Sequence, residues 1–576
     1  MADITRCDLS KVKRELIIAH KECAQRRVLN GAKWAAELSH ALEVSVDVQS
    51  LQGADHPDHW AEYDKYTLAT TYFDLKEYDR AALAVEQCTS PKAYFIHMYA
   101  RYLADEKRKI DNASDSIGPS ESVDNENLKV LKTDLSKKNV NKELDGFGLY
   151  LYGIVLRKLD LQKEAMNIFV EAVNKEPLHW GAWQELAMLI TDRETLSSLS
   201  LPDHWVRQLF MAHAYLELQL NEEGLAIYQT FLATGFSKSN YIVSQIAVAY
   251  HNMRDVDQAV TAFTELQKMD PYRVENMDIF SNLLYVKDMQ AELANLAHKC
   301  TEIDKYRVET CCVVGNYYSL RSQREKSILY FQRALKLNPH YLSAWTLIGH
   351  EFMEMKNTSA AIQAYRQAIE VNNRDYRAWY GLGQTYEILK MPSYSLYYHR
   401  QAQQLRPNDS RMVVALGECY EKLDRLQEAK KCFWKANSIG DVEGMALIKL
   451  AKLYEKLNEE HQAAAAYNEY VSQAERQGIN NTEELGPAFK YLSNYYVKTA
   501  QLDEAYITAQ KCVEFTEQRE EAKALLKQIQ ELRNLKHGAT TAQMDDSFTS
   551  IFPDQFQRNE FNPLGRLSPV NLRFTP

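Results

Sequence analysis

The clearest hydrophobic and polar pattern in this chain lies between Val308 and Asp409, where it repeats every 34 residues. Three windows that start at Val308, Leu342 and Tyr376 carry the same kinds of residue in the same columns. The aligned sets are Gly315, Gly349 and Gly383; Tyr318, Phe352 and Tyr386; Phe331, Tyr365 and His399; and Ala334, Ala368 and Ala402. A period held over consecutive windows predicts one supersecondary unit that is repeated along the chain.

Two further columns identify the unit. Trp345 and Trp379 share the fourth column, and Pro339 and Pro407 share the thirty-second, which is the spacing of a tetratricopeptide repeat (TPR). In such a repeat, the small eighth column lets helix A approach helix B closely. One unit cannot bury its apolar face alone, so neighbouring units stack into a superhelical solenoid whose inner surface is lined mostly by A helices. The sequence therefore predicts an all-α fold with a binding surface and no active-site pocket.

The same columns, in part degenerate, predict about twelve to thirteen units along the chain. We expect a helical region over 1–60, an N-terminal TPR array over 61–307, a C-terminal array over 308–535 that ends in a cap helix, and a disordered tail over 536–576. Residues 105–145 are a polar insertion in the first array. Their composition favours a solvated linker with a mobile first part, and a helix at Asn127–Lys138 is the alternative.

Composition and motifs exclude several kinds of function. The net charge of −10 gives no basic footprint for nucleic acid. The nine cysteines include no C-x-x-C pair, so we interpret them as reduced core thiols and expect no metal site. Phosphate-loop, zinc-protease and serine-hydrolase signatures are absent, which predicts neither catalysis nor a cofactor. No apolar run is long enough to span a bilayer and the first residues lack a signal-peptide core, so we expect an intracellular protein.

Repeat geometry indicates which residues could bind a ligand. Columns two, five, nine and twelve of helix A project toward the inner surface, and their amide, aromatic and charged groups could bind an extended peptide that carries an arginine. Asn316 is the foremost candidate, because an amide both donates and accepts. The candidate residues are Glu309, Cys312, Asn316, Ser319, Thr346, His350, Arg377, Tyr380, Gln384, Glu387 and Glu418. For any one of them, an ordinary solvated helix face remains an alternative.

The tail ends in two Ser/Thr-Pro steps. Ser568 precedes Pro569 and Thr575 precedes Pro576, so both are candidate sites for a proline-directed kinase. Phosphorylation would add roughly −1.5 to −2 charges at each site.

Several stretches resemble subunit eight of the anaphase-promoting complex, the Cdc-twenty-three type: residues 143–161, 237–255, 302–323, 330–392 and 404–423. The likeness runs from about residue 8 to residue 535 and is most specific over 143–440. It implies a non-catalytic scaffold subunit of a ubiquitin ligase that acts in the cell cycle, in nucleus and cytoplasm. It also implies a homodimer through the N-terminal repeats and contacts with other TPR and platform subunits. Finally, it implies a C-terminal groove for the activator's C-box, an arginine-bearing motif, with Asn316 foremost.

Two other classes of protein stay open. A TPR co-chaperone binds acidic peptide termini through clustered lysines and arginines, but the expected groove offers Glu309, Glu387 and Glu418 beside few cations. A TPR glycosyltransferase needs an α/β catalytic region, and no strand-rich stretch is present. The sequence therefore favours a scaffold over either alternative.

Overall fold

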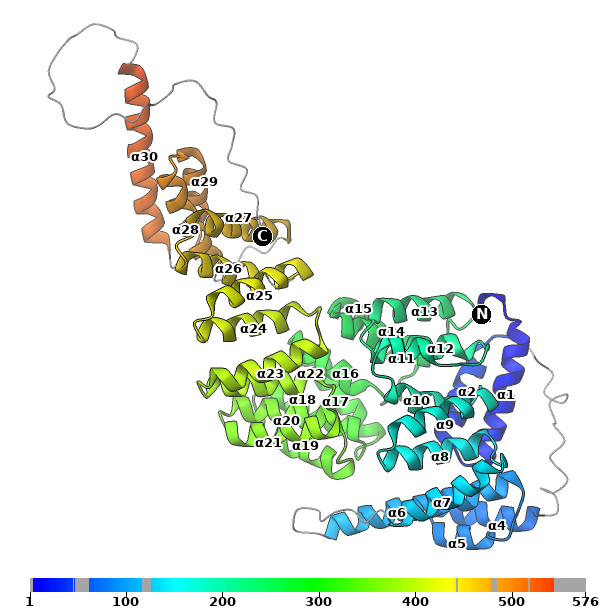
Figure 1. The fold of residues 1–576 in the computed structure, drawn as a ribbon. Coiled ribbons are helices and arrows are strands. Elements are labelled where there is room, and N and C mark those ends of the chain that lie inside the picture. Colours follow the sequence, from blue (N-terminus) through cyan, green and yellow to red (C-terminus); the bar gives the residue numbers. More distant parts are fainter. Residues whose placement is uncertain are drawn as a thin grey trace. The chain divides into compact units, whose positions relative to one another are not determined.

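The computed structural model describes residues 4–44, 46, 62–115, 126–441, 444–477, 484–515 and 518–542. Over these residues the chain forms one short 3₁₀ helix, Ile4–Arg6, and 29 α-helices, and it contains no strand (Figure 1). The chain divides into two compact units, unit 1 from Met1 to Gln323 and unit 2 from Arg324 to Pro576. The predicted all-α fold is confirmed.

Unit 1 begins with a helix pair and continues as an array of successive A and B helices. Asp8 and Asp145 cap the first turns of α1 and α8, since their carboxylates accept hydrogen bonds from backbone N–H groups. The helices are α1 Leu9–Gln25, α2 Leu29–Ala41, α4 Tyr63–Asp74, α5 Tyr78–Ala84, α6 Pro91–Asp115, α7 Glu126–Val140, α8 Gly146–Lys158, α9 Gln162–Lys175, α10 Trp180–Leu189, α11 Arg193–Ser198, α12 Val206–Glu217, α13 Asn221–Ala233, α14 Asn240–Met253, α15 Val256–Met269, α16 Met277–Val286, α17 Gln290–Ile303 and α18 Val308–Leu320.

Unit 2 continues the A–B alternation and ends in a longer helix. Its helices are α19 Arg324–Leu337, α20 Leu342–Glu354, α21 Thr358–Val371, α22 Tyr376–Ile388, α23 Pro392–Leu405, α24 Ser410–Lys422, α25 Leu426–Ile439, α26 Met445–Lys456, α27 Glu460–Gln477, α28 Leu485–Lys498, α29 Leu502–Cys512 and α30 Arg519–Ala542. In chain order, α4 to α29 are 26 helices among the described residues, which matches the expected twelve to thirteen two-helix units in number. Helices α18, α20, α22 and α24 begin where the 34-residue windows begin.

The small eighth column has the packing role that the pattern predicts. A Cβ at Gly349 would lie 2.5 Å from the ring of Tyr365, and one at Gly383 would lie 2.6 Å from the ring of His399. Real Cβ atoms do not approach other atoms so closely. The A and B helices of these pairs therefore owe their close approach to the absent side chain.

The polar insertion is largely helical, which corrects part of the sequence interpretation. Helix α6 continues to Asp115, and α7 runs over Glu126–Val140. Leu128, Leu131 and Leu135 of α7 are at most 2% exposed and belong to the main core of unit 1. The solvated-linker interpretation is therefore wrong for Asn127–Lys138, because leucines at helical spacing find a packing surface there. Residues 116–125 lie outside the described residues.

The end of the chain follows the expectation in part. The predicted cap helix is α30, which packs on α28 and α29 and buries Ala522 and Ile529. Its backbone stays helical to Ala542, beyond the expected start of the tail at residue 536. The rest of the expected tail, with Ser568 and Thr575, lies outside the described residues, as do residues 47–60 of the expected N-terminal helical region.

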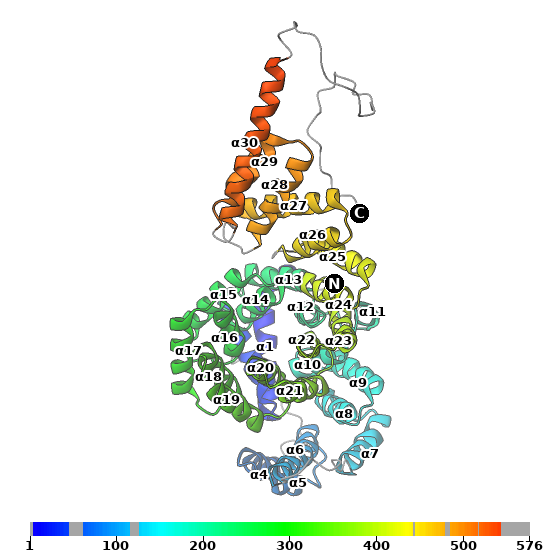
Figure 2. The ribbon, with the colours of Figure 1, turned by 90° about the vertical axis from the view of Figure 1, so that its left-hand side faces the viewer.

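The N-terminal helix pair is part of the core of unit 1. Helix α2 packs against α10 and α14, and the ring of Trp34 stacks on Trp180 with centroids 4.9 Å apart. Figure 2 shows α1 inside the curve that α12 to α17 make. The region expected over 1–60 is therefore helical where it is described, and it is packed rather than peripheral.

Candidate peptide-binding surface

The candidate residues of unit 1 lie on α18 and are mostly buried against the preceding A helix. Asn316 is 3% exposed, and its Nδ2 donates hydrogen bonds to Ser281 Oγ and Asn282 Oδ1, both at 2.7 Å. The hydroxyl of Ser319 donates to the hydroxyl of Tyr285 at 3.4 Å. These three partners belong to α16. The amide group that the sequence singles out therefore already connects two A helices.

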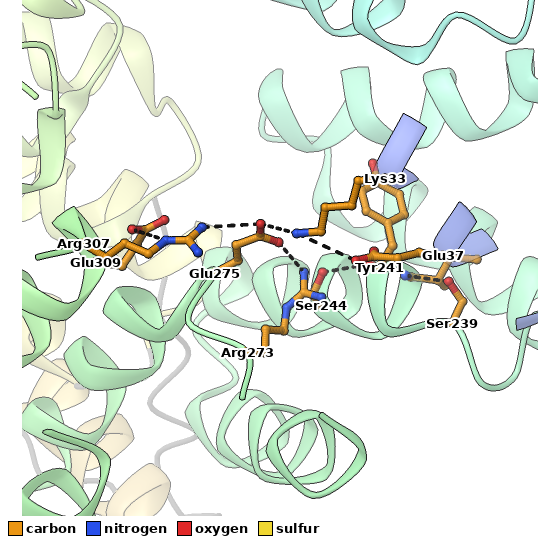
Figure 3. Close-up of polar contacts among 10 residues, drawn as sticks. Lys33, Glu37, Ser239, Tyr241, Ser244, Arg273, Glu275, Arg307 and Glu309 are labelled. Atoms are coloured by element: carbon orange, nitrogen blue, oxygen red, sulfur yellow. Dashed lines mark hydrogen bonds and ion pairs between the residues drawn. The ribbon is translucent and has the colours of Figure 1, made fainter. Parts of the chain in front are cut away.

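The other two α18 candidates are also engaged inside the protein. Cys312 is fully buried, and burial together with the charge of Asp278 raises the pKa of its thiol well above its usual value. Glu309 Oε2 accepts a hydrogen bond of 3.0 Å from Arg307 Nε (Figure 3). Arg307 Nη2 in turn donates to Glu275 at 3.4 Å. The carboxylate of Glu309 therefore already has a cationic partner.

The first candidates of unit 2 lie on α20. Thr346 is buried, and its hydroxyl donates to the backbone carbonyl of Ser343 at 2.9 Å within the same helix. His350 is exposed, and its Nδ1 lies 2.9 Å from the hydroxyl of Tyr365. Because Tyr365 also contacts the eighth-column glycine, helix packing orients His350. His350 is thus available to a ligand and Thr346 is not.

Three candidates on α22 are half-buried on one side of the helix. Arg377 Nε donates to Asp375 Oδ1 at 3.0 Å, which keeps the guanidinium close to the start of the helix. Tyr380 meets the ring of His399 edge-on, with centroids 5.2 Å apart. Gln384 makes no side-chain hydrogen bond within the described part of the chain, so its amide can both donate to a ligand and accept from one.

Both candidate glutamates of unit 2 carry lysine counterions. Glu387 forms an ion pair with Lys422, and its Oε2 lies 3.9 Å from His399 Nε2. The contact with His399 is the main cause that lowers the pKa of Glu387 to about 2, and Lys422 adds to the effect against desolvation. Glu418 Oε1 lies 2.8 Å from Lys449 Nζ. An arginine of a bound peptide would have to compete with a lysine of the following repeat for either carboxylate.

The sequence pattern missed these lysines. Each comes from the A helix one repeat after its glutamate: Glu387 lies on α22 and Lys422 on α24, while Glu418 lies on α24 and Lys449 on α26. A comparison of inward columns between neighbouring repeats could have found them. As a whole, the α20–α24 side of unit 2 presents a histidine, an arginine, a tyrosine, a glutamine and paired carboxylates, which suit an extended polar peptide.

Within the described part of the chain, no group of three or more His, Cys, Asp or Glu side chains could hold a metal ion. The cysteines are free thiols, and seven of the nine are buried. Among the described helices, none combines the length and apolar character that a membrane span needs.

Comparison with known families gives consistent matches. Residues 11–247 match the family described as anaphase promoting complex subunit 8 / Cdc23. Tetratricopeptide-repeat families match residues 243–273, 349–388, 410–439 and 445–474.

Curated proteins with similar sequences come from distant organisms. The chain is 59% identical over 300 residues to the human cell division cycle protein 23 homolog, which is 51% of this chain and 50% of the human protein. It is 44% identical over 238 residues to anaphase-promoting complex subunit 8 of Arabidopsis thaliana, 41% of each chain. It is 30% identical over 380 residues to subunit CDC23 of Saccharomyces cerevisiae, 51% of this chain and 61% of that one. The chain thus spans about half the length of the curated relatives it matches.

A solved structure shares the fold. A chain from the crystal structure titled APC/C hetero-tetramer Cut9-Hcn1 superposes with a TM-score of 0.55 and 16% identity, covering 89% of this chain and 95% of the other. At that identity the likeness concerns the fold alone. The repeat pattern, the helix pairs and the sequence matches agree: this chain is a TPR protein, and over residues 11–247 it is similar to the anaphase-promoting complex subunit 8/Cdc23 family.

Proposed function

We propose that this protein is a scaffold subunit of the anaphase-promoting complex. It forms a homodimer through its N-terminal repeats and binds the other TPR and platform subunits. The inner columns of its C-terminal repeats bind the C-box of an activator. The ligase chemistry belongs to other subunits, and the scaffold acts in nucleus and cytoplasm during the cell cycle.

The observation that carries the peptide-binding part is the set of side chains on consecutive A helices of unit 2. They are His350 on α20, Arg377, Tyr380, Gln384 and Glu387 on α22, and Glu418 on α24. None of the six is fully buried, and they combine hydrogen-bond donors, acceptors and an aromatic ring. An extended peptide that crosses A helices meets such side chains at regular intervals.

Glu387 gives the sharpest test of this proposal. Glu387→Gln should lower the affinity for an arginine-bearing C-box peptide about tenfold to a hundredfold, because hydrogen bonds to charged groups contribute about 1.5–3 kcal/mol. Lys422→Gln should keep or strengthen binding, since it removes the competing ammonium. Fluorescence anisotropy with a labelled peptide would measure both.

The matched control is Glu428→Gln. Glu428 lies on the B helix α25, its side chain is 42% exposed, and it pairs with Arg425. Its replacement should leave the affinity unchanged. Equal affinities for the Glu387 and Glu428 variants would refute the role of Glu387.

Asn316 stays a candidate with a second role. Its amide holds Ser281 and Asn282, so Asn316→Ala should weaken peptide binding and also loosen α18 from α16. Circular dichroism must therefore accompany the binding measurement. Lost binding with unchanged helicity and melting temperature would support a direct contact with the peptide.

The homodimer is supported by apolar side chains on the surface of the first repeat. Leu68 on α4, Leu75 just after it and Leu83 on α5 are 47%, 66% and 71% exposed. Large apolar side chains exposed within one repeat suit an interaction surface. A two-fold dimer would cover the same side chains on both copies.

The alternative co-chaperone function gains little support. Two of the groove cations it would need, Lys422 and Lys449, are already paired with Glu387 and Glu418. Recovery of chaperones in place of anaphase-promoting subunits from a cell extract would favour it. Ser568 and Thr575 remain predicted phosphorylation sites.

A further inference from the structure

The N-terminal pair α1–α2 lies where a TPR array presents its binding surface. We use "inner surface of unit 1" for the side of α10, α12 and α14 that faces α1 and α2. Helix α2 packs against α10 and α14, and the stacked rings of Trp34 and Trp180 are tilted by only 4°. These helices are the first members of successive A–B pairs, and A helices line the inner surface of a TPR array.

Apolar burial holds the pair in place. Leu16, Ala35, Leu38 and Leu42 are at most 1% exposed. They belong to one core with the apolar side chains of α8 to α14, including Val206, Leu209, Phe210, Ile242 and Ile246. The inner surface of unit 1 is therefore covered by an amphipathic helix pair as a bound partner helix would cover it.

Polar contacts fix the position of α1. Glu15 Oε2 accepts a hydrogen bond of 3.0 Å from Trp205 Nε1 and lies 3.3 Å from His204 Nε2. Gln208 Oε1 accepts one of 3.1 Å from the backbone N–H of Ile4. These partners flank or begin α12, some 190 residues along the chain, and together they position α1 and the 3₁₀ turn before it against α12.

A chain of ion pairs anchors α2 to the start of α18 (Figure 3). Lys33 of α2 pairs with Glu275 in the connection between α15 and α16. Glu275 also lies 3.3 Å from Arg273 and 3.4 Å from Arg307, and Arg307 binds Glu309. Both oxygens of one half-buried carboxylate thus bind cations. The N-terminal pair is connected through Glu275 and Arg307 to the candidate residue Glu309.

We propose that residues 4–44 are a built-in ligand of the inner surface of unit 1. They occupy the face that would otherwise accept a helical or extended segment of another protein. External segments are thereby excluded from α10, α12 and α14, and recognition by inner columns begins at α18. The occupant is this chain's own segment, held in cis by the Trp34–Trp180 stack and the Lys33–Glu275 pair.

Zero-length cross-linking tests the placement in the full-length protein. A carbodiimide should cross-link Lys33 to Glu275. The positive control is a second ion pair of unit 1, Lys287 with Asp257, which should cross-link as well. In a mixture of unlabelled and ¹⁵N-labelled chains, mass spectrometry should find the Lys33–Glu275 peptides with a single isotope composition. Mixed compositions would show that a second copy supplies the segment, and that result would overturn the proposal. Absence of this cross-link while the control forms would overturn it too.

A competition experiment tests the segment as a ligand. Wild-type protein should bind a labelled synthetic peptide of residues 4–44 at least tenfold more weakly than the double variant Trp34→Ala/Lys33→Glu, whose own segment is loosened. If the double variant loses helicity, the single variant Lys33→Glu takes its place, because it keeps the apolar contacts. Its affinity for the peptide should rise by a smaller factor. Equal peptide binding by wild type and by a folded variant would refute the proposal.

Discussion

Among single residues, His179 is a buried titratable group of unit 1. It is 2% exposed just before α10, and its ring stacks on Phe147 at 4.6 Å and meets Tyr150 edge-on at 4.4 Å. Neither ring nitrogen has a hydrogen-bond partner among the described residues. Desolvation, helped by the charge of Arg26, lowers the pKa of His179 to about 3 from its ordinary 6.5. The ring therefore stays neutral in the folded protein near neutral pH.

A pH dependence of stability follows from His179. Below pH 6.5, His179 becomes protonated in the unfolded chain, whereas in the folded protein it stays neutral down to about pH 3. The free energy of unfolding therefore falls as the pH falls below 6.5. The loss is about 1.4 kcal/mol per pH unit within that window. His179→Phe keeps an aromatic ring and should remove this contribution. Urea unfolding followed by tryptophan fluorescence at pH 7 and pH 5.5 would measure it, and equal pH slopes for the two proteins would contradict it.

At the scale of elements, the turns between A and B helices carry a repeated backbone conformation. A residue with φ between 54° and 60° occurs every 34 residues: Asp288, Ser322, Lys356, Lys390, Asp424 and Asn458. None of them is glycine, and side chains disfavour this left-handed region by about 1–2 kcal/mol. The helix packing on either side of each turn therefore holds a mildly strained residue.

Lys390→Gly should relieve this strain. The free energy of unfolding should rise by about 0.5–1 kcal/mol, because the relief exceeds the extra entropy that glycine loses on folding. Lys336→Gly is the control, since Lys336 is exposed near the end of α19 and should lose up to about 1 kcal/mol. Chemical denaturation of the two variants should give shifts of opposite sign. A loss of stability in both would contradict the strain argument.

Helix α7 shows how packing overrides a polar composition. Leu131→Ala should destabilise unit 1 by about 2–5 kcal/mol, the usual cost of a core truncation. Val130→Ala changes a neighbour that is 50% exposed and should have an effect within about 0.5 kcal/mol. Thermal unfolding of both variants would decide, because a solvated linker would tolerate the two changes equally.

At the scale of the whole molecule, the proposed homodimer predicts a change in mass. Leu68→Glu combined with Leu83→Glu places charges at two exposed leucines of the first repeat and should convert the proposed dimer to a monomer. Val286→Glu, at a side chain 73% exposed elsewhere in unit 1, should leave the dimer intact. Light scattering after size exclusion would measure the mass. A wild-type protein that is monomeric at micromolar concentration would end the dimer proposal.

The helix pairs and their 34-residue phase can be predicted from the residue pattern alone. Helix starts at Val308, Leu342, Tyr376 and Ser410 follow the predicted windows, and Gly349 and Gly383 contact the partner rings that the columns indicate. The reason is that each TPR contact joins residues of one unit or of its neighbour, so a period along the chain specifies it. For the same reason, the repeat columns correctly predict that His350, Tyr380 and Gln384 lie on accessible sides of their helices.

The three-dimensional packing was needed to see which polar groups already have partners and which helices cover the inner surface of unit 1. Asn316 binds α16, Glu387 binds Lys422, and residues 4–44 fill the inner surface of α10, α12 and α14. The Lys33–Glu275 pair joins residues separated by 242 positions. Such contacts depend on how the stacked units curve, and a repeat period does not encode that curvature.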